Sequence, residues 1–313
     1  MALLQELIRD DGQGQYNPTL ARYVIDRMIA ENAIWSVAQW YTMRGNADAP
    51  YKAGSGSAGG TRNIGSDFST TTANPTTDTF SLAIYGGKVA TDIAFARRGD
   101  DLGTERTRQL AQEASAISRG LVNDLVNGDG AAGHLRGLAT TAPSVTFGGA
   151  NGGEFPADDK KKIAAFLEFL RRQMIYTGCN CIIANSDFIG RLEMIEKEHV
   201  RYDSVQSAFD DAQLNTLRTY KTVPLIDAGF NRDMSGLVID NTETVGTSTD
   251  CTSIYLVRWG EKTDLSLATN VGVQVKDLGV QGSAYVTQIE IDVQVAYLSP
   301  RAALRIKGIR LNV

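Results

Sequence analysis

The stretch TERTRQLAQEASAISRGLVNDLVNGD, residues 104–129, decides the fold because it predicts one long amphipathic helix. Its apolar side chains recur at helical spacing and form a single stripe of Leu110, Ala114, Ile117, Leu121 and Leu125. We expect Thr104 to cap the start of this helix and Asn127-Gly128 to end it. At 1.5 Å per residue, the helix would be on the order of 36 Å long.

The preceding stretch, TFSLAIYGGKVATDIAFARRGDD at residues 79–101, predicts a strand. Two runs of alternating residues carry this prediction, namely Phe80, Leu82 and Ile84, and then Val89, Thr91, Ile93 and Phe95. The phase of the alternation changes across Gly86-Gly87. We therefore expect a β-bulge at these two glycines.

Gly, Ser, Thr and Asn dominate residues 42–79, where apolar residues are almost absent. This composition is typical of a disordered linker between domains, but it also fits a long exposed β-hairpin arm. The strand that follows favours the arm, because the segment then emerges from a sheet. Folded back once, the segment would form two limbs of about 19 residues, each extending about 60 Å. The remaining residues should form a body roughly 50 Å across, so the arm could overlie a neighbouring molecule.

The rest of the chain predicts a mixture of helices and short strands. Residues 1–17 are expected to form a polar arm, and Asn17-Pro18 predicts the start of a helix that continues to about Tyr41. Two further helices are expected in residues 156–175 and 186–199. Apolar strands are expected in residues 179–184, 220–229, 236–241, 253–260, 285–297 and 303–311. Residues 285–297 alternate almost perfectly and are long for a single strand.

Composition excludes several classes of protein. Of the 313 residues, 42% are hydrophobic and 21% are charged, as in ordinary globular proteins. Lys plus Arg number 31 against 36 Asp plus Glu, whereas proteins that grip nucleic acid tightly usually carry a basic surplus. We detect no signal peptide and no apolar run near the roughly 18 residues of a membrane-spanning helix. Three cysteines cannot build a disulfide framework, which favours folding in a reducing cytoplasm.

One glycine motif could in principle bind a nucleotide. Gly128, Gly130 and Gly133 form a literal G-x-G-x-x-G. A dinucleotide site needs this motif between a strand and a helix N-terminus, where the amides meet the pyrophosphate. Here the motif follows a helix and leads into a loop. We therefore expect a helix C-cap and a turn.

Other patterns for catalysis or metal binding are weak. Cys179-x-Cys181 lacks the second ligand pair of a zinc site, and both thiols are expected to be small core residues. The only histidines, His134 and His199, form no ligand pair and no triad pattern. We predict no catalytic residue, no metal site, no cofactor and no enzymatic activity. A sparse basic stretch near the C-terminus is expected to be surface or interface charge: Arg301, Arg305, Lys307 and Arg310.

The order of these stretches resembles the major capsid proteins of tailed phages, which have the Hong Kong 97-type fold. Residues 42–79 resemble the extended loop of that family, residues 79–101 its return strand, and residues 104–127 its spine helix. The sequence LVNDLVNGDGAAGHLRGLAT, residues 121–140, is similar to the glycine-rich end of the spine helix. Three later stretches resemble further family patterns: residues 181–195, 220–229 and 293–309. The resemblance covers nearly the whole chain.

The resemblance implies an α+β, Hong Kong 97-like capsid fold with two domains, an extended β-hairpin loop and an N-terminal arm. The peripheral domain would combine a long spine helix with long β-strands, and the axial domain would hold a mixed sheet flanked by helices. The implied boundaries are 1–41 for the N-terminal arm and helix, 42–79 for the extended loop, 80–130 and 276–299 for the peripheral domain, 131–275 for the axial domain, and 300–313 for its C-terminal strand.

The implied function is that of a major capsid protein, which self-assembles into the icosahedral head around the genome of a tailed double-stranded DNA bacteriophage. Many copies would form pentamers and hexamers, with a separate scaffolding protein and a portal as partners. Packaged DNA would be contacted only non-specifically and no membrane is involved. Assembly would occur in the host bacterial cytoplasm, and the protein would reside in the virion. The alternatives are an encapsulin-like nanocompartment shell and, from another class, a soluble nucleotide-binding enzyme.

The resemblance also implies where subunits touch. We expect the charged residues of the extended loop, Arg44, Lys52, Arg62 and Asp67, to contact neighbouring subunits. Some relatives join subunits through a loop lysine bonded to an asparagine next door, and Lys52 is the only lysine in residues 42–79. Many relatives begin with a scaffolding segment that is later removed. Only a short arm precedes the fold here, so scaffolding is expected to be a separate protein, or the chain is already mature.

Overall fold

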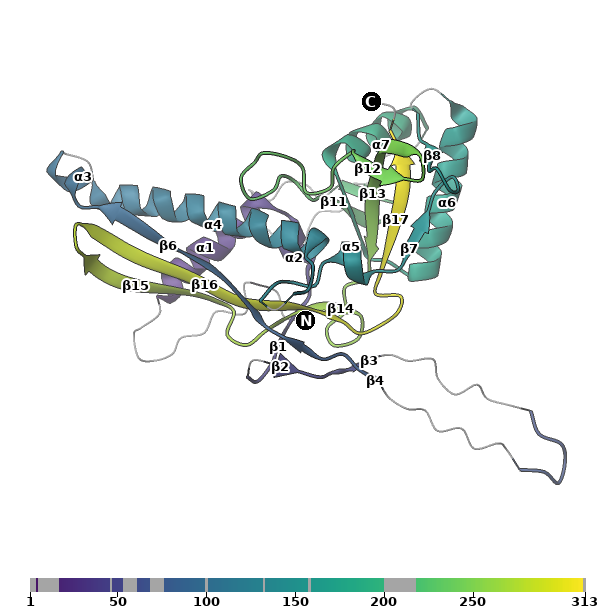
Figure 1. The fold of residues 1–313 in the computed structure, drawn as a ribbon, viewed down its shortest axis with the longest axis horizontal. Coiled ribbons are helices and arrows are strands. Elements are labelled where there is room, and N and C mark those ends of the chain that lie inside the picture. The colour runs from purple at the N-terminus through teal and green to yellow at the C-terminus, as the bar shows by residue number, and fades with distance from the viewer. Residues whose placement is uncertain are drawn as a thin grey trace.

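Two sheets and the helices packed on them make up the fold (Figure 1). The computed structural model describes residues 4, 17–45, 47–52, 61–67, 76–98, 101–131, 133–156, 159–199 and 218–311. Among these residues, the first sheet contains β1 (Trp40–Thr42), β6 (Ala83–Asp92), β14 (Leu265–Thr269), β15 (Val273–Gln281) and β16 (Ala284–Tyr297). The second contains β7 (Ser144–Thr146), β8 (Gly153–Glu154), β9 (Cys181–Ala184), β10 (Arg218–Tyr220), β11 (Val223–Asp227), β12 (Glu243–Val245), β13 (Ser248–Val257) and β17 (Ala303–Arg310).

The long helices divide between the two sheets. Helices α1 (Pro18–Glu31) and α4 (Leu102–Asn127) lie along the first sheet, and α6 (Lys160–Thr177) and α7 (Ser186–His199) flank the second (Figure 1). Short helices occupy the connections: α2 (Ile34–Val37), α3 (Ala94–Arg97) and α5 (Leu138–Thr141). The expected α+β architecture, with a long helix beside long strands and a mixed sheet flanked by helices, is therefore present.

Strand β16 holds the first sheet together because three strands pair with it. Strand β6 runs antiparallel to it, β15 pairs with its first part and β14 with its last part. The alternation predicted for residues 285–297 is confirmed. The odd-numbered residues face the core, and the most deeply buried of them are Ile289, Ile291, Val293 and Val295, each 1% exposed.

Helix α4 packs its predicted stripe against this sheet. All five stripe residues are buried, from Leu110 to Leu125. The helix ends at Asn127 as expected, but the predicted cap at Thr104 is wrong. Asp101 is the N-cap, because its carboxylate accepts the N–H groups of Gly103 (3.2 Å) and Thr104 (3.1 Å) and the Thr104 hydroxyl (2.6 Å). The helix therefore begins at Leu102.

The predicted β-bulge at Gly86-Gly87 is also wrong. Strand β6 pairs with β16 in continuous register through both glycines. The phase changes earlier, at Leu82, between the short β5 (Phe80–Ser81) and β6, so Ile84 points outward and is 70% exposed. The glycines serve close approach instead: a Cβ on Gly86 would lie 2.3 Å from the carbonyl oxygen of Ile289.

The N-terminal helix is shorter than the sequence indicates. Asn17 caps it as expected, accepting the N–H groups of Thr19 and Leu20 at 3.1 Å each. However, α1 ends at Glu31 because the side chain of Asn32 donates to the carbonyl oxygens of Asp227 and Ala228, and its Oδ1 accepts the Ile34 N–H. The chain then turns into α2 and β1. Of the predicted N-terminal arm, only Leu4 is described, and it is fully buried in the core of the first sheet.

The second sheet is buried on both faces, which explains its continuous apolar runs. In β9, Ile182 and Ala184 enter a core with α6 and α7, while Cys181 and Ile183 enter the core shared with the first sheet. The α6–α7 core is aromatic, and the rings of Phe155 and Phe166 lie 4.1 Å apart. Residues 236–241, predicted as a strand, form only one isolated bridge, between Leu237 and Phe230.

The sheet change does not fall where the predicted domain boundary lies. The prediction assigns residues 131–275 to one domain, but β14 and the start of β15 belong to the first sheet. The chain leaves the second sheet after Val257. Short apolar strands carry no local signal for their sheet, because their pairing partners are distant in sequence.

The stripe of α4 offers a direct test of this packing. Leu121→Ala should lower the free energy of unfolding by roughly 2–5 kcal/mol, because Leu121 is 1% exposed and its removal leaves a cavity. Gln112→Ala, on the exposed face of the same helix, should change it by less than about 0.5 kcal/mol. Urea unfolding followed by circular dichroism measures both. Equal effects of the two substitutions would contradict the packing described.

Candidate assembly site: the root of the extended hairpin

The predicted arm leaves the body as an antiparallel ribbon. Strand β2 (Ala47–Asp48) pairs with β5, and β3 (Tyr51–Lys52) pairs with β4 (Thr76–Thr77). The Asp78 N–H also donates to the carbonyl oxygen of Pro50 at 2.9 Å. The hairpin prediction is confirmed at its root, while residues 53–60 and 68–75 lie outside the described part. Residues 61–67 lie away from both sheets (Figure 1), and all are exposed.

A buried carboxylate fastens the hairpin to the body. Asp78 is 7% exposed, and both of its oxygens accept from a guanidinium nitrogen of Arg136 at 3.0 Å. One oxygen also accepts the Tyr297 N–H at 3.3 Å. A charged pair with these additional hydrogen bonds is held in one geometry. Asp78 therefore joins the hairpin to β16 and to the loop that follows α4.

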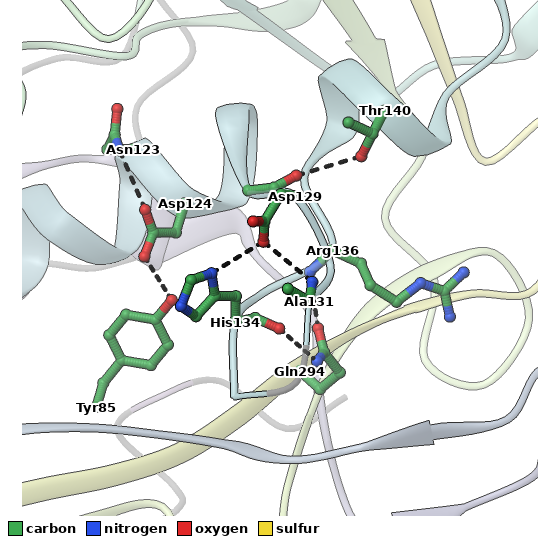
Figure 2. Close-up of polar contacts among 10 residues, drawn as sticks. Tyr85, Asn123, Asp124, Asp129, Ala131, His134, Arg136, Thr140 and Gln294 are labelled. Carbon is green, nitrogen blue, oxygen red and sulfur yellow. Dashed lines mark hydrogen bonds and ion pairs between the residues drawn. The ribbon is translucent and has the colours of Figure 1, made fainter.

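That loop, residues 128–137, is itself fixed by one glutamine. The side-chain amide of Gln294, 5% exposed on β16, donates to the carbonyl oxygens of Ser81 (3.1 Å) and His134 (3.0 Å). Its oxygen accepts the Arg136 N–H at 2.9 Å. Figure 2 shows Gln294 reaching both residues of the loop. We refer to Asp78, Arg136 and Gln294 as the root junction.

The glycine motif in this loop is a turn, as predicted, and not a phosphate cradle. Gly128 follows the C-terminus of α4, and a Cβ on Gly137 would lie 2.3 Å from its nitrogen. Asp129 fills the turn: its carboxylate accepts the Ala131 N–H at 3.0 Å and contacts His134 Nδ1 at 2.9 Å (Figure 2). A carboxylate in this position would repel a phosphate. The close backbone contacts instead bring Arg136 to the hairpin.

A tyrosine ties the same end of α4 to the sheet. The Tyr85 hydroxyl on β6 donates to Asp124 Oδ2 at 2.5 Å (Figure 2). Burial, followed by the neighbouring carboxylate, raises the pKa of Tyr85 well above its ordinary value. The hydroxyl thus stays a donor at physiological pH.

A small apolar cluster lies beneath the hairpin root. It consists of Tyr41, Met43, Phe80, Leu82, Ala268, Ala296 and Leu298. The pKa of Tyr41 is raised, first by burial and then by the nearby carboxylates of Asp48 and Asp78. The cluster packs the root onto β14 and β16, so the hairpin leaves the body from a rigid base.

The four predicted contact residues fall into two separate groups. Arg44 and Lys52 lie at the root, and the Lys52 ammonium sits 5.4 Å from the ring centroid of Tyr297. Arg62 and Asp67 lie at the exposed tip, where Arg62 donates to the carbonyl oxygen of Ser66 at 3.1 Å. Their contacts with other subunits remain predictions.

The sequence analysis missed the root junction. Asp78 was included in the loop without a role, and Arg136 lay within the glycine-rich turn. The usable signal was a lone carboxylate just before an apolar strand, but its partner is 58 residues away.

The remaining candidates for chemistry are structural. Burial raises the pKa of Cys181 to about 12 and also raises those of Cys179 and Cys251, so all three thiols are poor nucleophiles. The described chain gathers no group of three or more His, Cys, Asp or Glu side chains that could hold a metal ion. His199 lies at the end of α7, and nothing is described of its side chain. No helix among the described residues is long and apolar enough to span a membrane.

Most of the C-terminal basic stretch is satisfied within the molecule. Arg305 pairs with Glu243 at 2.8 Å and donates to the hydroxyl of Ser253 at 3.1 Å. Arg310 pairs with Asp250 at 3.0 Å. Arg301 extends instead over the ring of Tyr176, at 5.1 Å from its centroid.

Comparison with known proteins identifies the class of fold. No protein-family model matches the sequence, and no curated protein sequence is significantly similar to it. Three solved structures are similar. The holo-SrpI encapsulin complex of Synechococcus elongatus PCC 7942 is 14% identical with a TM-score of 0.57, over 89% of this chain and 87% of the other. The capsid of the native GTA particle is 14% identical with a TM-score of 0.55, over 90% of each chain. The capsid of cyanophage A-1(L) is 11% identical with a TM-score of 0.51, over 88% and 92%.

These likenesses show the fold. The chain has the α+β, Hong Kong 97-type fold of phage capsid and encapsulin shell proteins, as the sequence resemblance indicates.

The root junction can be tested by removing one partner. Arg136→Ala should lower the free energy of unfolding by roughly 3–5 kcal/mol, because it leaves the carboxylate of Asp78 buried and unpaired. Arg108→Ala removes the partner of Glu105 on the exposed side of α4 and should cost less than about 1 kcal/mol. Urea unfolding compares the two variants. Similar losses would show that Asp78 is solvated in solution.

The thiols provide a second test. At about pH 8, an aromatic disulfide reagent that reports free thiols should react slowly with the native protein, because all three thiols are buried and protonated. Unfolding in guanidinium should release three equivalents. Lys161→Cys, on the exposed face of α6, should add one fast equivalent in the native state. Fast reaction of the unsubstituted native chain would contradict the burial described.

Proposed function

We propose that this chain is the major capsid protein of a tailed double-stranded DNA bacteriophage and self-assembles into the icosahedral head around the genome. One observation carries the proposal: a hairpin is locked to the body at its root, while its described tip, residues 61–67, is exposed along its whole length. A limb of this kind has little to pack against in its own chain. It can bury surface only on another molecule.

Assembly by such limbs follows from general physics. A symmetric shell repeats the same contacts in every copy, so modest contacts suffice. A segment that becomes ordered on a partner loses entropy when it binds, and each single contact therefore remains reversible. Reversible contacts permit errors to be corrected before the shell closes.

The two sheets take different places in the proposed shell. The unit built on the first sheet and α4 would be the peripheral domain, and the unit built on the second sheet would be the axial domain around the five- and six-fold centres. Pentamers and hexamers of this chain, a separate scaffolding protein and a portal are the proposed partners. Assembly would take place in the host bacterial cytoplasm, and the mature protein would reside in the virion.

DNA inside the shell would be contacted without specificity. The net charge is −5, and Arg305 and Arg310 are already paired within the chain. Neither feature supports a dedicated nucleic-acid site. No enzymatic step is part of the proposal, since the glycine motif forms a turn and the thiols are buried.

An encapsulin-like nanocompartment shell is the second candidate. The likeness to the SrpI encapsulin supports it as far as the fold goes. The long extended hairpin favours the phage head, because encapsulins resemble this chain with a shorter loop. Electron microscopy of particles from the producing cells separates the two: DNA-filled heads support the capsid proposal, and small shells around an enzyme cargo support the alternative.

The hairpin itself provides the sharpest test. Deleting residues 46–76 should leave a folded subunit, because the root junction and the two main cores lie outside that range. The deleted chain should form no closed particles, since the limb that reaches a neighbour is gone. Circular dichroism checks folding, and sedimentation with electron microscopy checks assembly against the full-length chain. Normal particles from the deleted chain would refute a role for the hairpin in assembly.

A further inference from the structure

A basic cleft lies in the angle between the hairpin root and the second sheet. It measures about 600 Å³, within the usual size range of binding pockets. Its walls come from the segment between α5 and β7, the end of α6 and the turn before β17. Lys52 and Arg301 contribute two positive charges, and none of the described lining residues is acidic. Neither cation forms an ion pair within the described part of the chain.

Apolar surface continues from this cleft along α6. Tyr176, which lines the cleft, is 59% exposed, and its neighbour Ile175 is 73% exposed. Adjacent large apolar side chains on a surface mark an interaction site when they are rimmed by charge. The chemistry of the cleft therefore fits a segment that combines apolar side chains with a carboxylate.

The same chain carries a segment of that chemistry. The loop of residues 229–237, which follows β11, exposes Phe230 (53%) and Met234 (64%), with the exposed Asp233 between them. Asp233 forms no ion pair with any described residue. We call this segment the 229–237 loop.

The 229–237 loop is held in one shape. Its base is closed by the bond from the Val238 N–H to the Gly229 carbonyl oxygen at 3.0 Å. The side chain of Asn231 makes two bonds to Ser235, each 2.9 Å long. These bonds keep Met234 in the left-handed region at φ 55°, which a residue with a side chain adopts rarely. A preorganised loop loses little entropy on binding.

The loop and the cleft cannot meet within one molecule. The loop emerges from β11, near one edge of the second sheet, and the cleft borders β7, at the other edge (Figure 1). Four strand spacings separate β11 from β7, or about 19 Å. The loop is also fastened to α4, where Arg119 donates to the carbonyl oxygen of Arg232 at 3.3 Å. A contact between them must therefore join two copies.

We propose that the 229–237 loop of one copy docks in the basic cleft of the next, with Asp233 facing Lys52 and Arg301. The two surfaces lie on different sides of the molecule, so the contact is head-to-tail and repeats around a closed ring. This contact rests on the proposed shell function and assigns it a specific ring-forming interface. It is separate from the reach of the hairpin tip.

Engineered disulfides test the contact in assembled particles. Met234→Cys combined with Ser144→Cys should give, after mild oxidation, a ladder of linked subunits on a non-reducing gel, because each copy then links to the next. The native thiols are buried and should not contribute. Met234→Cys combined with Lys161→Cys is the matched control, because residue 161 lies about 22 Å along α6 from Tyr176. Neither this control nor the single variants should give a ladder.

Charge reversal supplies a second readout. Asp233→Arg should raise the protein concentration needed for particle formation about tenfold, and adding Arg301→Asp should restore it, as expected for one directly coupled charge pair. Particles without the ladder and without rescue would overturn the contact and leave the shell function intact. A full-length chain that forms no particles under any assembly condition would refute both proposals.

Discussion

The packing of α4 against β16 is the interaction on which the rest of the structure depends. A 26-residue helix lies along a 14-residue strand, and the apolar stripe of one meets the inner face of the other. Burying both stripes requires the two elements to be long and straight, so the first sheet becomes elongated. Strand β16 has polar residues only where they are used, and Gln294 is the clearest example. The same strand thus builds the core and positions the hairpin.

The hairpin is rigid at its root for reasons that lie outside the hairpin. Asp78 bonds to Arg136 and to the backbone of Tyr297, while Gln294 fixes the loop that carries Arg136. The close glycine contacts at residues 128 and 137 make that loop possible, because side chains there would collide with backbone. The glycine motif therefore has a mechanical role. It brings the end of the long helix to the base of the limb.

The described surface is asymmetric in a way that suits ring formation. An ordered loop with two exposed apolar residues lies on one side of the second sheet, and a cleft with two cations lies on the other. The hairpin root borders that cleft through Lys52, so a molecule seated there would also touch the limb. Contacts of the limb and of the cleft would then reinforce one another between the same two copies.

The sequence by itself determined the elements whose signals are local. The stripe of α4, the alternation of β16, the Asn17 cap and the glycine turn could all be read from neighbouring residues, and the fold class followed from their order. Sheet membership of β14, the end of α1 at Asn32, the regular pairing of β6 at Gly86 and the Asp78–Arg136 pair were decided only by the tertiary structure. Each depends on a partner far away in the chain. Periodicity and capping act within a few residues, whereas the pairing of strands and of buried charges is fixed only when distant segments are packed together.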